Sequence, residues 1–158
     1  IIVHGLAKAY SMTGWRIGFM AAPLPIAKAI SAIQSHSTSN PTSFAQSGAV
    51  QALDGPQDHL GEWLGHFGQR RSFACEKLNA IEGVTCVNSE GAFYLFPNIS
   101  GTGMKSVEFC ERLLAEAKVA AVPGIAFGSD DYIRISYATS MENLQQALDR
   151  VEGFVSSL

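Results

Sequence analysis

The sequence predicts an α/β protein, and three observations lead to that fold class. Two short apolar runs, at residues 1–4 and 17–22, are flanked by Gly and Pro and are typical of buried strands in an α/β sheet. From Pro25 onward the apolar spacing becomes helical. After Gly83 the chain turns to short strands and turns that alternate with helices, the texture of a compact α+β unit. We therefore expect a domain boundary near Gly83.

Three helices are expected before that boundary. The first covers about 25–35, and the second begins where Ser43 and Gln46 have the spacing of a capping box. The third and longest covers about 57–81, because its apolar residues stay three or four positions apart. These residues are Leu60, Leu64, Phe67, Ala74, Leu78 and Ile81. Arg71 interrupts this stripe, either with its stem over apolar surface and its guanidinium in water or in a buried ion pair.

The second part is expected to contain four strands and two helices. The strands are predicted at 84–87, 92–96, 119–122 and 132–136, and the helices at 105–117 and 141–157. Thr139 and Glu142 have capping-box spacing at the start of the last helix. Its apolar stripe comprises Leu144, Leu148, Val151, Val155 and Leu158.

Composition and charge exclude several classes of protein. The 158 residues are 47% hydrophobic and 16% charged, as in a globular protein, and the net charge of -3 comes without a basic stripe for nucleic acid. No apolar run is long enough to span a membrane and no secretory signal is visible, so a cytoplasmic location is expected. Cys75, Cys86 and Cys110 are predicted to be reduced core residues. His59 and His66 lack a third ligand at metal-site spacing, so no metal is expected.

The charged residues near the start of the chain suggest chemistry. Lys8 and Arg16 lie between two predicted strands, where α/β folds place their ligands, and the run contains Gly5, Gly14 and Gly18. An exposed lysine is usually only solvated. Two cations of different kinds in a weakly charged, glycine-rich run favour a catalytic role for Lys8, because a solvated face would normally mix signs. For Arg16 the alternative is a structural ion pair.

The run Gly5-Leu6-Ala7-Lys8-Ala9-Tyr10-Ser11-Met12-Thr13-Gly14-Trp15-Arg16-Ile17-Gly18 closely resembles the pyridoxal-phosphate attachment motif of class I aminotransferases, in the aspartate aminotransferase group. Four later segments resemble that family in family order. They are Ser39-Asn40-Pro41-Thr42-Ser43, Gly91-Ala92-Phe93-Tyr94, Val122-Pro123-Gly124-Ile125-Ala126-Phe127-Gly128 and Ile133-Arg134-Ile135-Ser136-Tyr137. The resemblance covers nearly the whole chain.

The resemblance implies roles for three residues. Lys8 would carry pyridoxal 5'-phosphate as a Schiff base and act as the catalytic base, and Arg16 would bind the cofactor phosphate. Arg134 would bind the substrate α-carboxylate with both guanidinium nitrogens. Strand alternation alone would equally allow Arg134 to point to solvent. Many family members have serine before the lysine, so Ala7 implies one phosphate hydrogen bond fewer, a loss of about 1–3 kcal/mol.

The resemblance also implies an architecture, the C-terminal part of a fold-type I transferase. Residues 1–82 would be the end of the large cofactor-binding α/β domain with a long interdomain helix, and 83–158 the small C-terminal α+β domain. The family aspartate that partners the cofactor ring would precede Ile1. We therefore expect the chain, which begins with isoleucine, to be a trimmed product or a piece of a longer protein, inactive by itself.

The expected function is transfer of an amino group between an amino acid, aspartate or a related acidic or aromatic one, and a 2-oxo acid. A homodimer is implied, with residues 40–43 near the subunit interface. Two alternatives remain: a carbon–sulfur lyase on the same fold, or a non-catalytic α+β interaction domain. Phe93 and Phe127, in turn-rich family segments near the substrate, are expected to pack rather than react.

Overall fold

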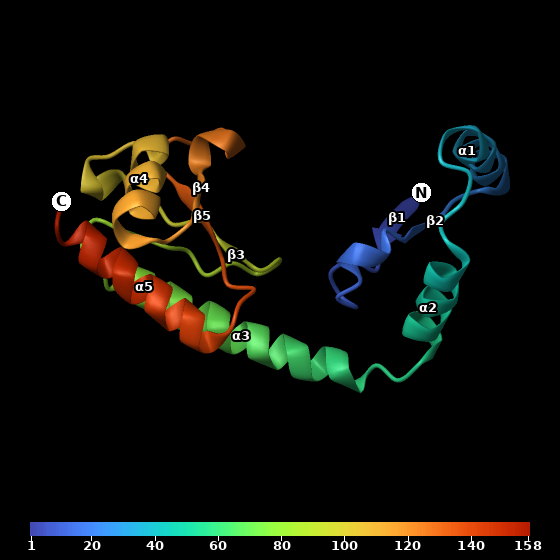
Figure 1. The fold of residues 1–158 in the computed structure, drawn as a ribbon, viewed down its shortest axis with the longest axis horizontal. Helices are drawn as coiled ribbons and strands as arrows, with labels where there is room; N and C mark the ends of the chain where they lie inside the picture. The colour runs from blue at the N-terminus through green and yellow to red at the C-terminus, as the bar shows by residue number, and fades with distance from the viewer. The chain divides into compact units, whose positions relative to one another are not determined.

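The computed structural model describes residues 1–158, and the chain divides into two compact units, 1–62 and 63–158. Figure 1 labels the helices and strands of both units. The predicted mixture of helices and strands is confirmed. The division between the units falls inside helix α3 (Asp58–Asn79), whereas the sequence predicts a domain boundary near Gly83. The two-domain assignment made from the sequence stays a prediction.

Unit 1 contains a two-stranded antiparallel sheet. Strands β1 (Ile2–Gly5) and β2 (Gly18–Ala21) lie where the sequence predicts strands, with Gly5 opposite Gly18. Their predicted burial is wrong for this chain, because the sheet has only two strands and no layer of unit 1 covers its apolar side chains. Val3, for example, is 78% exposed.

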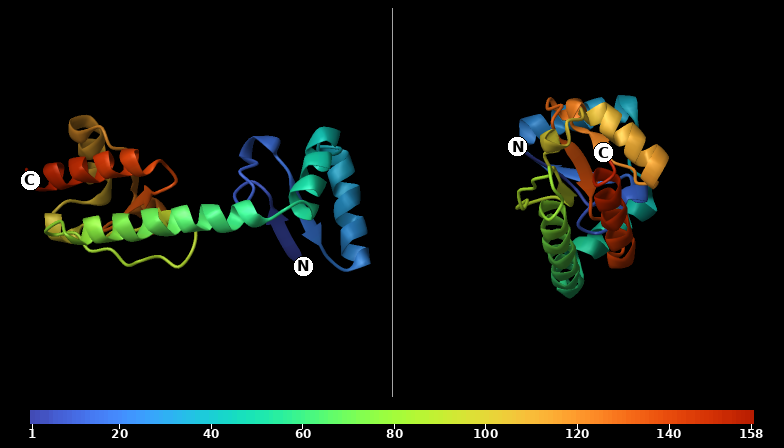
Figure 2. Two further views of the ribbon diagram at one scale, coloured as in Figure 1. Left: turned by 90° about the horizontal axis from the view of Figure 1, so that it is seen from below. Right: turned by 90° about the vertical axis from the view of Figure 1, so that its left-hand side faces the viewer.

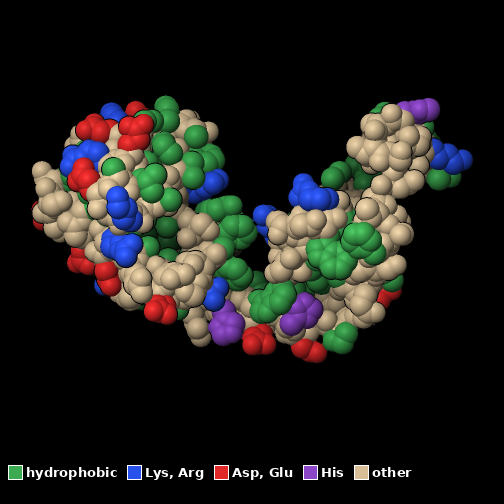
Figure 3. All heavy atoms as spheres, viewed as in Figure 1, with side chains coloured by type: hydrophobic (Ala, Val, Ile, Leu, Met, Phe, Trp, Pro, Cys, Tyr) green, Lys and Arg blue, Asp and Glu red, His purple; other side chains and the backbone are tan.

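Helices α1 (Leu24–Ser37) and α2 (Ser43–Asp54) confirm the two predicted short helices. The predicted capping box at the start of α2 is wrong. The N-cap residue is Thr42, whose side chain makes no capping hydrogen bond, and Gln46 Nε2 instead donates to the carbonyl oxygen of Pro41 at 2.9 Å. Several apolar side chains of α1 and α2 are exposed, such as Leu24 at 65% and Phe44 at 68%, as is typical of surfaces that bind another protein segment. Figure 3 shows where hydrophobic side chains reach one face of the molecule.

Helix α3 confirms the long predicted helix, but its apolar stripe is buried only toward its end. Ala74 and Leu78 are buried, whereas Leu64 is 71% exposed. Both predictions for Arg71 are wrong. Its Nη1 donates to the backbone carbonyl of Ser89 at 3.0 Å rather than to a carboxylate, and its Nε is buried without a hydrogen-bond partner rather than in water.

Unit 2 contains a three-stranded antiparallel sheet with the order β3-β5-β4. Its strands are β3 (Tyr94–Leu95), β4 (Val122–Pro123) and β5 (Ile133–Ser136). The predicted strand at 84–87 is wrong, because only Thr85 forms an isolated bridge, with Asn98.

Unit 2 contains two further helices, one between β3 and β4 and one after β5. Helix α4 (Ser106–Arg112) continues into a single π-helical turn (Leu113–Ala117), so the predicted helix at 105–117 is confirmed with a change of winding. Helix α5 (Met141–Val155) confirms the last predicted helix. It runs beside the second half of α3 (Figure 2), where Lys77 Nζ and Asp149 Oδ1 form an ion pair at 2.9 Å. No helix is both long and apolar enough to cross a membrane.

The start of α5 differs from its prediction by one residue. Ser140, not Thr139, is the N-cap, and its Oγ accepts a hydrogen bond from the backbone N–H of Asn143 at 3.1 Å. Most of the predicted stripe is buried, as Leu144 and Val151 illustrate. Which residue caps the helix therefore depends on the local backbone path, and the spacing of polar residues does not reveal that path.

The main hydrophobic core lies entirely in unit 2. In unit 1 only Leu6, Met12 and Ala45 are buried apolar residues. The core of unit 2 joins all three of its major helices to the sheet, and Phe109 of α4 packs edge to face on Phe154 of α5, with 5.3 Å between ring centroids. Unit 2 therefore has a core of its own, whereas unit 1 has little buried apolar surface to stabilise it.

Replacing Phe109 by alanine is expected to destabilise unit 2 by about 3–5 kcal/mol, because this fully buried ring would leave a cavity between two helices. The free energy of unfolding would be measured by denaturant titration. Val107→Ala, at a 44% exposed position on the same helix, is the control and should change stability much less. Equal losses in both variants would contradict this assignment of the core.

All three cysteines are free thiols and buried, as predicted. Burial, together with the neighbouring Cys75, raises the pKa of the Cys86 thiol to about 12, and burial raises the pKa of Cys110 to about 11. At pH 8 the thiolate fraction of these two residues should be roughly 100- to 1,000-fold below that of a free thiol. We expect both to react with an aromatic disulfide reagent only in denaturant. Rapid labelling of the folded protein would contradict this.

Candidate active site

Lys8 and Arg16 lie in one loop, residues 6–17, which connects β1 to β2 (Figure 1). The Gly5–Gly18 pair closes this loop. Gly18 allows the closure, since a Cβ there would lie 2.9 Å from the carbonyl oxygen of His4. The pairing of β1 with β2 therefore holds both predicted cofactor residues between two fixed strand ends.

Two buried residues of the loop and the contacts of Tyr10 hold the loop in place. Leu6 and Met12 are buried, at 1% and 7% exposure. Tyr10 donates its hydroxyl hydrogen to Gln57 Oε1 at 2.9 Å and its ring lies 6.3 Å from that of His59. These contacts fix the backbone on both sides of Lys8, whose side chain is exposed.

Trp15 anchors the loop to α2. Its indole lies edge to face with Phe44, with 6.1 Å between ring centroids. A Cβ on Gly48 would come within 2.6 Å of the Trp15 ring, so only glycine allows this contact without a shift. Because Trp15 directly precedes Arg16, this contact also fixes the position of the Arg16 backbone in the loop.

Arg16 has a left-handed backbone conformation, with φ of 51°, and its side chain is exposed. Its Nη1 donates to the carbonyl oxygen of Thr13 at 3.0 Å. The structural ion pair considered for Arg16 is not found, because the guanidinium bonds to a backbone carbonyl and not to a carboxylate. A guanidinium held this way keeps donors for an anion.

Arg134 lies on the central strand of unit 2. Ile133 and Ile135 on either side are buried in the core, so alternation turns the half-buried Arg134 to the other face of the sheet. There its Cζ lies 4.3 Å from the ring centroid of Tyr94 and 4.7 Å from that of Phe127. The guanidinium thus lies against two aromatic rings, and no carboxylate of this chain pairs with it.

The aromatic residues near Arg134 form a connected set. Phe127 lies edge to face with Phe96 at 5.9 Å, and Phe96 stacks on Tyr132 at 5.0 Å with an interplanar angle of 10°. The prediction that Phe127 packs is confirmed, as is that for Phe93, whose ring lies 4.5 Å from that of Tyr94. Tyr94 is not among the predicted site residues, because the sequence does not specify the register that pairs it with Ser136, two residues from Arg134 on the same face of the sheet.

A surface cavity of about 300 Å³ lies elsewhere in unit 2, beside the first half of α5. Its lining includes Lys118, Asn143 and Arg150, but none of the three predicted site residues. The candidate functional residues are Lys8 and Arg16 in unit 1 and, separately, Arg134 in unit 2; none of them borders this cavity. The described side chains contain no group of three or more metal-ligating residues.

Comparison with known proteins gives the family. The family model for aminotransferases of class I and II matches residues 1–151. The chain belongs to this aminotransferase family. The resemblance to a C-terminal portion of class I aminotransferases is thereby confirmed. Enzymes of this aminotransferase family depend on pyridoxal phosphate.

Several relatives of this aminotransferase chain are known. It is 48% identical to aspartate aminotransferase of Geobacillus stearothermophilus over 99% of its length and 42% identical to aspartate/prephenate aminotransferase of Nitrosomonas europaea. It spans 41% and 42% of those two proteins. The crystal structure of Rhizobium meliloti aspartate aminotransferase matches 98% of the chain with a TM-score of 0.93 and 44% identity. That of Pyrococcus horikoshii aromatic aminotransferase also matches 98% of the chain, with a TM-score of 0.92 and 40% identity. The chain covers 41% of the first protein chain and 42% of the second. The predicted fold class is therefore confirmed.

Proposed function

We propose that the protein containing this chain transfers an amino group between an amino acid and a 2-oxo acid, with pyridoxal phosphate as cofactor. Lys8 and Arg16 would hold the cofactor, and Arg134 would hold the substrate carboxylate. The observation that carries the proposal is the closed loop 6–17, which carries the exposed residues Lys8 and Arg16 in a chain of the aminotransferase family.

The chemistry of these donors fits the cofactor. An aldehyde bonds covalently only to a nucleophile such as the primary amine of Lys8. A phosphate dianion is best bound by a guanidinium such as Arg16, and the hydroxyls of Ser11 and Thr13 are exposed on the same loop. These hydroxyls are the candidates to replace the serine that Ala7 lacks.

Pyridoxal phosphate, when bound, supplies an aldehyde for amines and an electron-poor ring that stabilises charge at the substrate Cα. Lys8 would take the proton from that Cα as general base and deliver it to the cofactor carbon C4′, and would reverse this transfer with the 2-oxo acid in the second half of the reaction. Arg134 would bind the carboxylate through two parallel hydrogen bonds, which fixes the direction of the Cα–H bond. That direction decides which bond at Cα breaks.

The proposed donor is aspartate or a related acidic or aromatic amino acid. This choice is supported by the relatives, which are named as aspartate, aspartate/prephenate and aromatic aminotransferases. A homodimer is proposed as well. Exposed apolar side chains on α2 support an interface there, with Phe44 68% and Val50 59% exposed.

Borohydride reduction followed by peptide mass spectrometry tests the cofactor assignment on the complete gene product that contains these residues. We expect one pyridoxyl adduct, on Lys8. An adduct on another lysine would overturn the assignment, and so would none at all. Incubation with amino acids then separates the reactions: an aminotransferase forms pyridoxamine phosphate and a 2-oxo acid, whereas the alternative carbon–sulfur lyase releases pyruvate and a thiol without pyridoxamine phosphate.

A further inference from the structure

We propose that Tyr94 and Phe127 are positioning residues, which hold the guanidinium of Arg134 in one fixed plane for a substrate carboxylate. The inference rests on the proposed role of Arg134. It adds to that role two residues which act through the arginine and need not touch the substrate.

The first argument is the geometry of the three side chains. Arg134 Cζ lies 4.3 Å and 4.7 Å from two ring centroids, well within the range of cation–π attraction. Contact with two rings restricts the orientations of the planar guanidinium. Bidentate binding of a carboxylate requires the two groups to share a plane, so an arginine held in advance loses less entropy on binding.

The second argument is that each ring is itself fixed. Tyr94 belongs to β3, where it pairs with Ser136 of β5, two residues beyond the arginine. Phe127 ends the short 3-10 helix Gly124–Phe127 and is wedged edge to face against Phe96. Neither ring depends on a ligand for its place.

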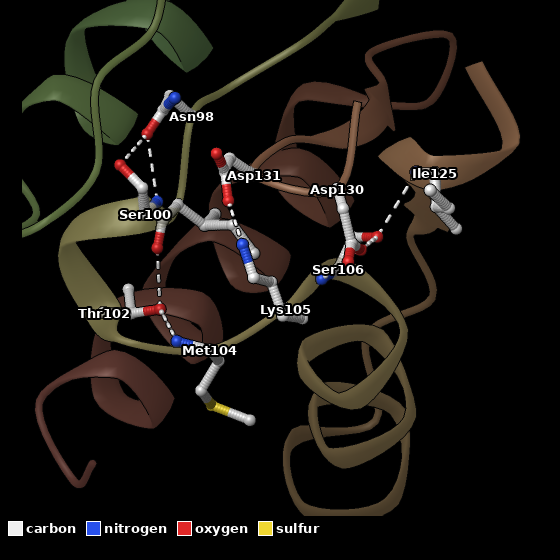
Figure 4. A network of polar contacts seen from close by, with 10 residues as sticks. Asn98, Ser100, Thr102, Met104, Lys105, Ser106, Ile125, Asp130 and Asp131 are labelled. Carbon is white, nitrogen blue, oxygen red and sulfur yellow. Dashed lines mark hydrogen bonds and ion pairs between the residues drawn. The ribbon is translucent and has the colours of Figure 1, made fainter. Parts of the chain in front are cut away.

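The turn that carries Phe127 is tied to the rest of unit 2 at two points. Gly124 donates its N–H to the carbonyl oxygen of Tyr132 at 2.8 Å, and a Cβ at this glycine would lie 2.2 Å from that oxygen. Figure 4 shows the second tie: Asp130 Oδ1 accepts hydrogen bonds from Ser106 Oγ at 2.6 Å and Ser106 N at 3.1 Å. Ser106 Oγ in turn accepts from Ile125 N at 3.3 Å.

The rings should therefore affect carboxylate recognition and leave chemistry at Lys8 unchanged. The test uses the complete gene product loaded with pyridoxal phosphate, and two probes of one shape, 3-phenylpropanoate and its neutral amide. Calorimetry measures the Kd of both probes. Single-turnover kinetics with an amino acid separate the substrate affinity from the maximal rate.

Phe127→Leu and Tyr94→Leu should each weaken binding of the carboxylate about 3- to 30-fold, with less than about twofold change for the amide. The variants Phe127→Tyr and Tyr94→Phe keep a ring and should bind like the parent. Phe73→Leu, a half-buried ring of α3 outside this set, is the matched control and should leave both Kd values unchanged.

Equal weakening of both probes would overturn the inference, because it would indicate general disruption of the site. Unchanged carboxylate binding in the leucine variants would overturn it too. Failure of the proposed function would look different: the parent protein itself would show neither a pyridoxyl adduct on Lys8 nor amino transfer. If the parent protein is active and its leucine variants keep their preference for the carboxylate, the inference is wrong and the proposed function still holds.

Removing the tie at Asp130 is expected to cost stability. In Asp130→Ala the buried Ser106 loses the acceptor for its hydroxyl, and unit 2 should unfold at a lower temperature than in the parent protein. Asp131→Ala is the control, because its ion pair with Lys105 is exposed and should contribute little. Thermal unfolding of both variants measures the difference. Comparable losses would contradict the importance of the buried tie.

Discussion

Replacing Lys8 by alanine is expected to lower the rate of amino transfer by at least about 10⁴-fold. The variant loses the amine that bonds the cofactor and the base that moves the Cα proton, and proton transfer alone contributes roughly 10²–10⁴-fold. The measurement is a single-turnover reaction of the complete gene product with an excess of amino acid, followed by the appearance of 2-oxo acid. Pyridoxal phosphate should still bind, though reversibly, since Arg16 remains.

The control is Lys28→Ala, an exposed lysine of α1 with the same charge change. It should keep the full rate. Lys8→Arg is a second control, because it keeps a cation but lacks a nucleophilic amine, and it should be as slow as the alanine variant. A Lys8→Ala protein that retained more than a few percent of the parent rate would show that another residue is the base.

Replacing Arg134 by alanine is expected to lower kcat/KM for an amino acid by roughly 10²–10⁴-fold, as two hydrogen bonds to a charged group are lost. The loss should appear mainly as a higher KM if the carboxylate contact is equal in substrate and transition state, and in kcat if it also aligns the Cα–H bond. Steady-state kinetics over a wide substrate range distinguish these two cases.

Two further variants serve as comparisons for Arg134→Ala. Arg134→Lys keeps the charge but loses the planar fork, so its kcat/KM should lie between those of the parent and the alanine variant. Arg70→Ala removes another arginine of unit 2 that lies over a ring, 5.5 Å from the centroid of Phe67, and should leave kinetics unchanged. If Arg134→Ala bound amino acids as tightly as the parent, the carboxylate would have to be held elsewhere.

Local rules predicted the secondary structure well where apolar periodicity was long and unbroken. Helices α3 and α5 follow directly from stripes such as the one containing Leu144 and Leu148, because a 3.6-residue repeat leaves few alternatives. Short elements were less predictable. Thr85 makes only an isolated bridge, and the cap of α5 is Ser140 rather than its neighbour Thr139, because both depend on the path of the backbone nearby.

By itself the sequence determined the family motif, the candidate roles of Lys8, Arg16 and Arg134, and most helices. The helices follow from residue identity and spacing, whereas the roles of the three residues are those that the family resemblance implies. Only the tertiary structure decided what surrounds those residues. It placed Tyr94 and Phe127, 33 positions apart (127 - 94 = 33), against one guanidinium. Such contacts arise from strand register and packing between distant segments, so no local pattern in the sequence reveals them.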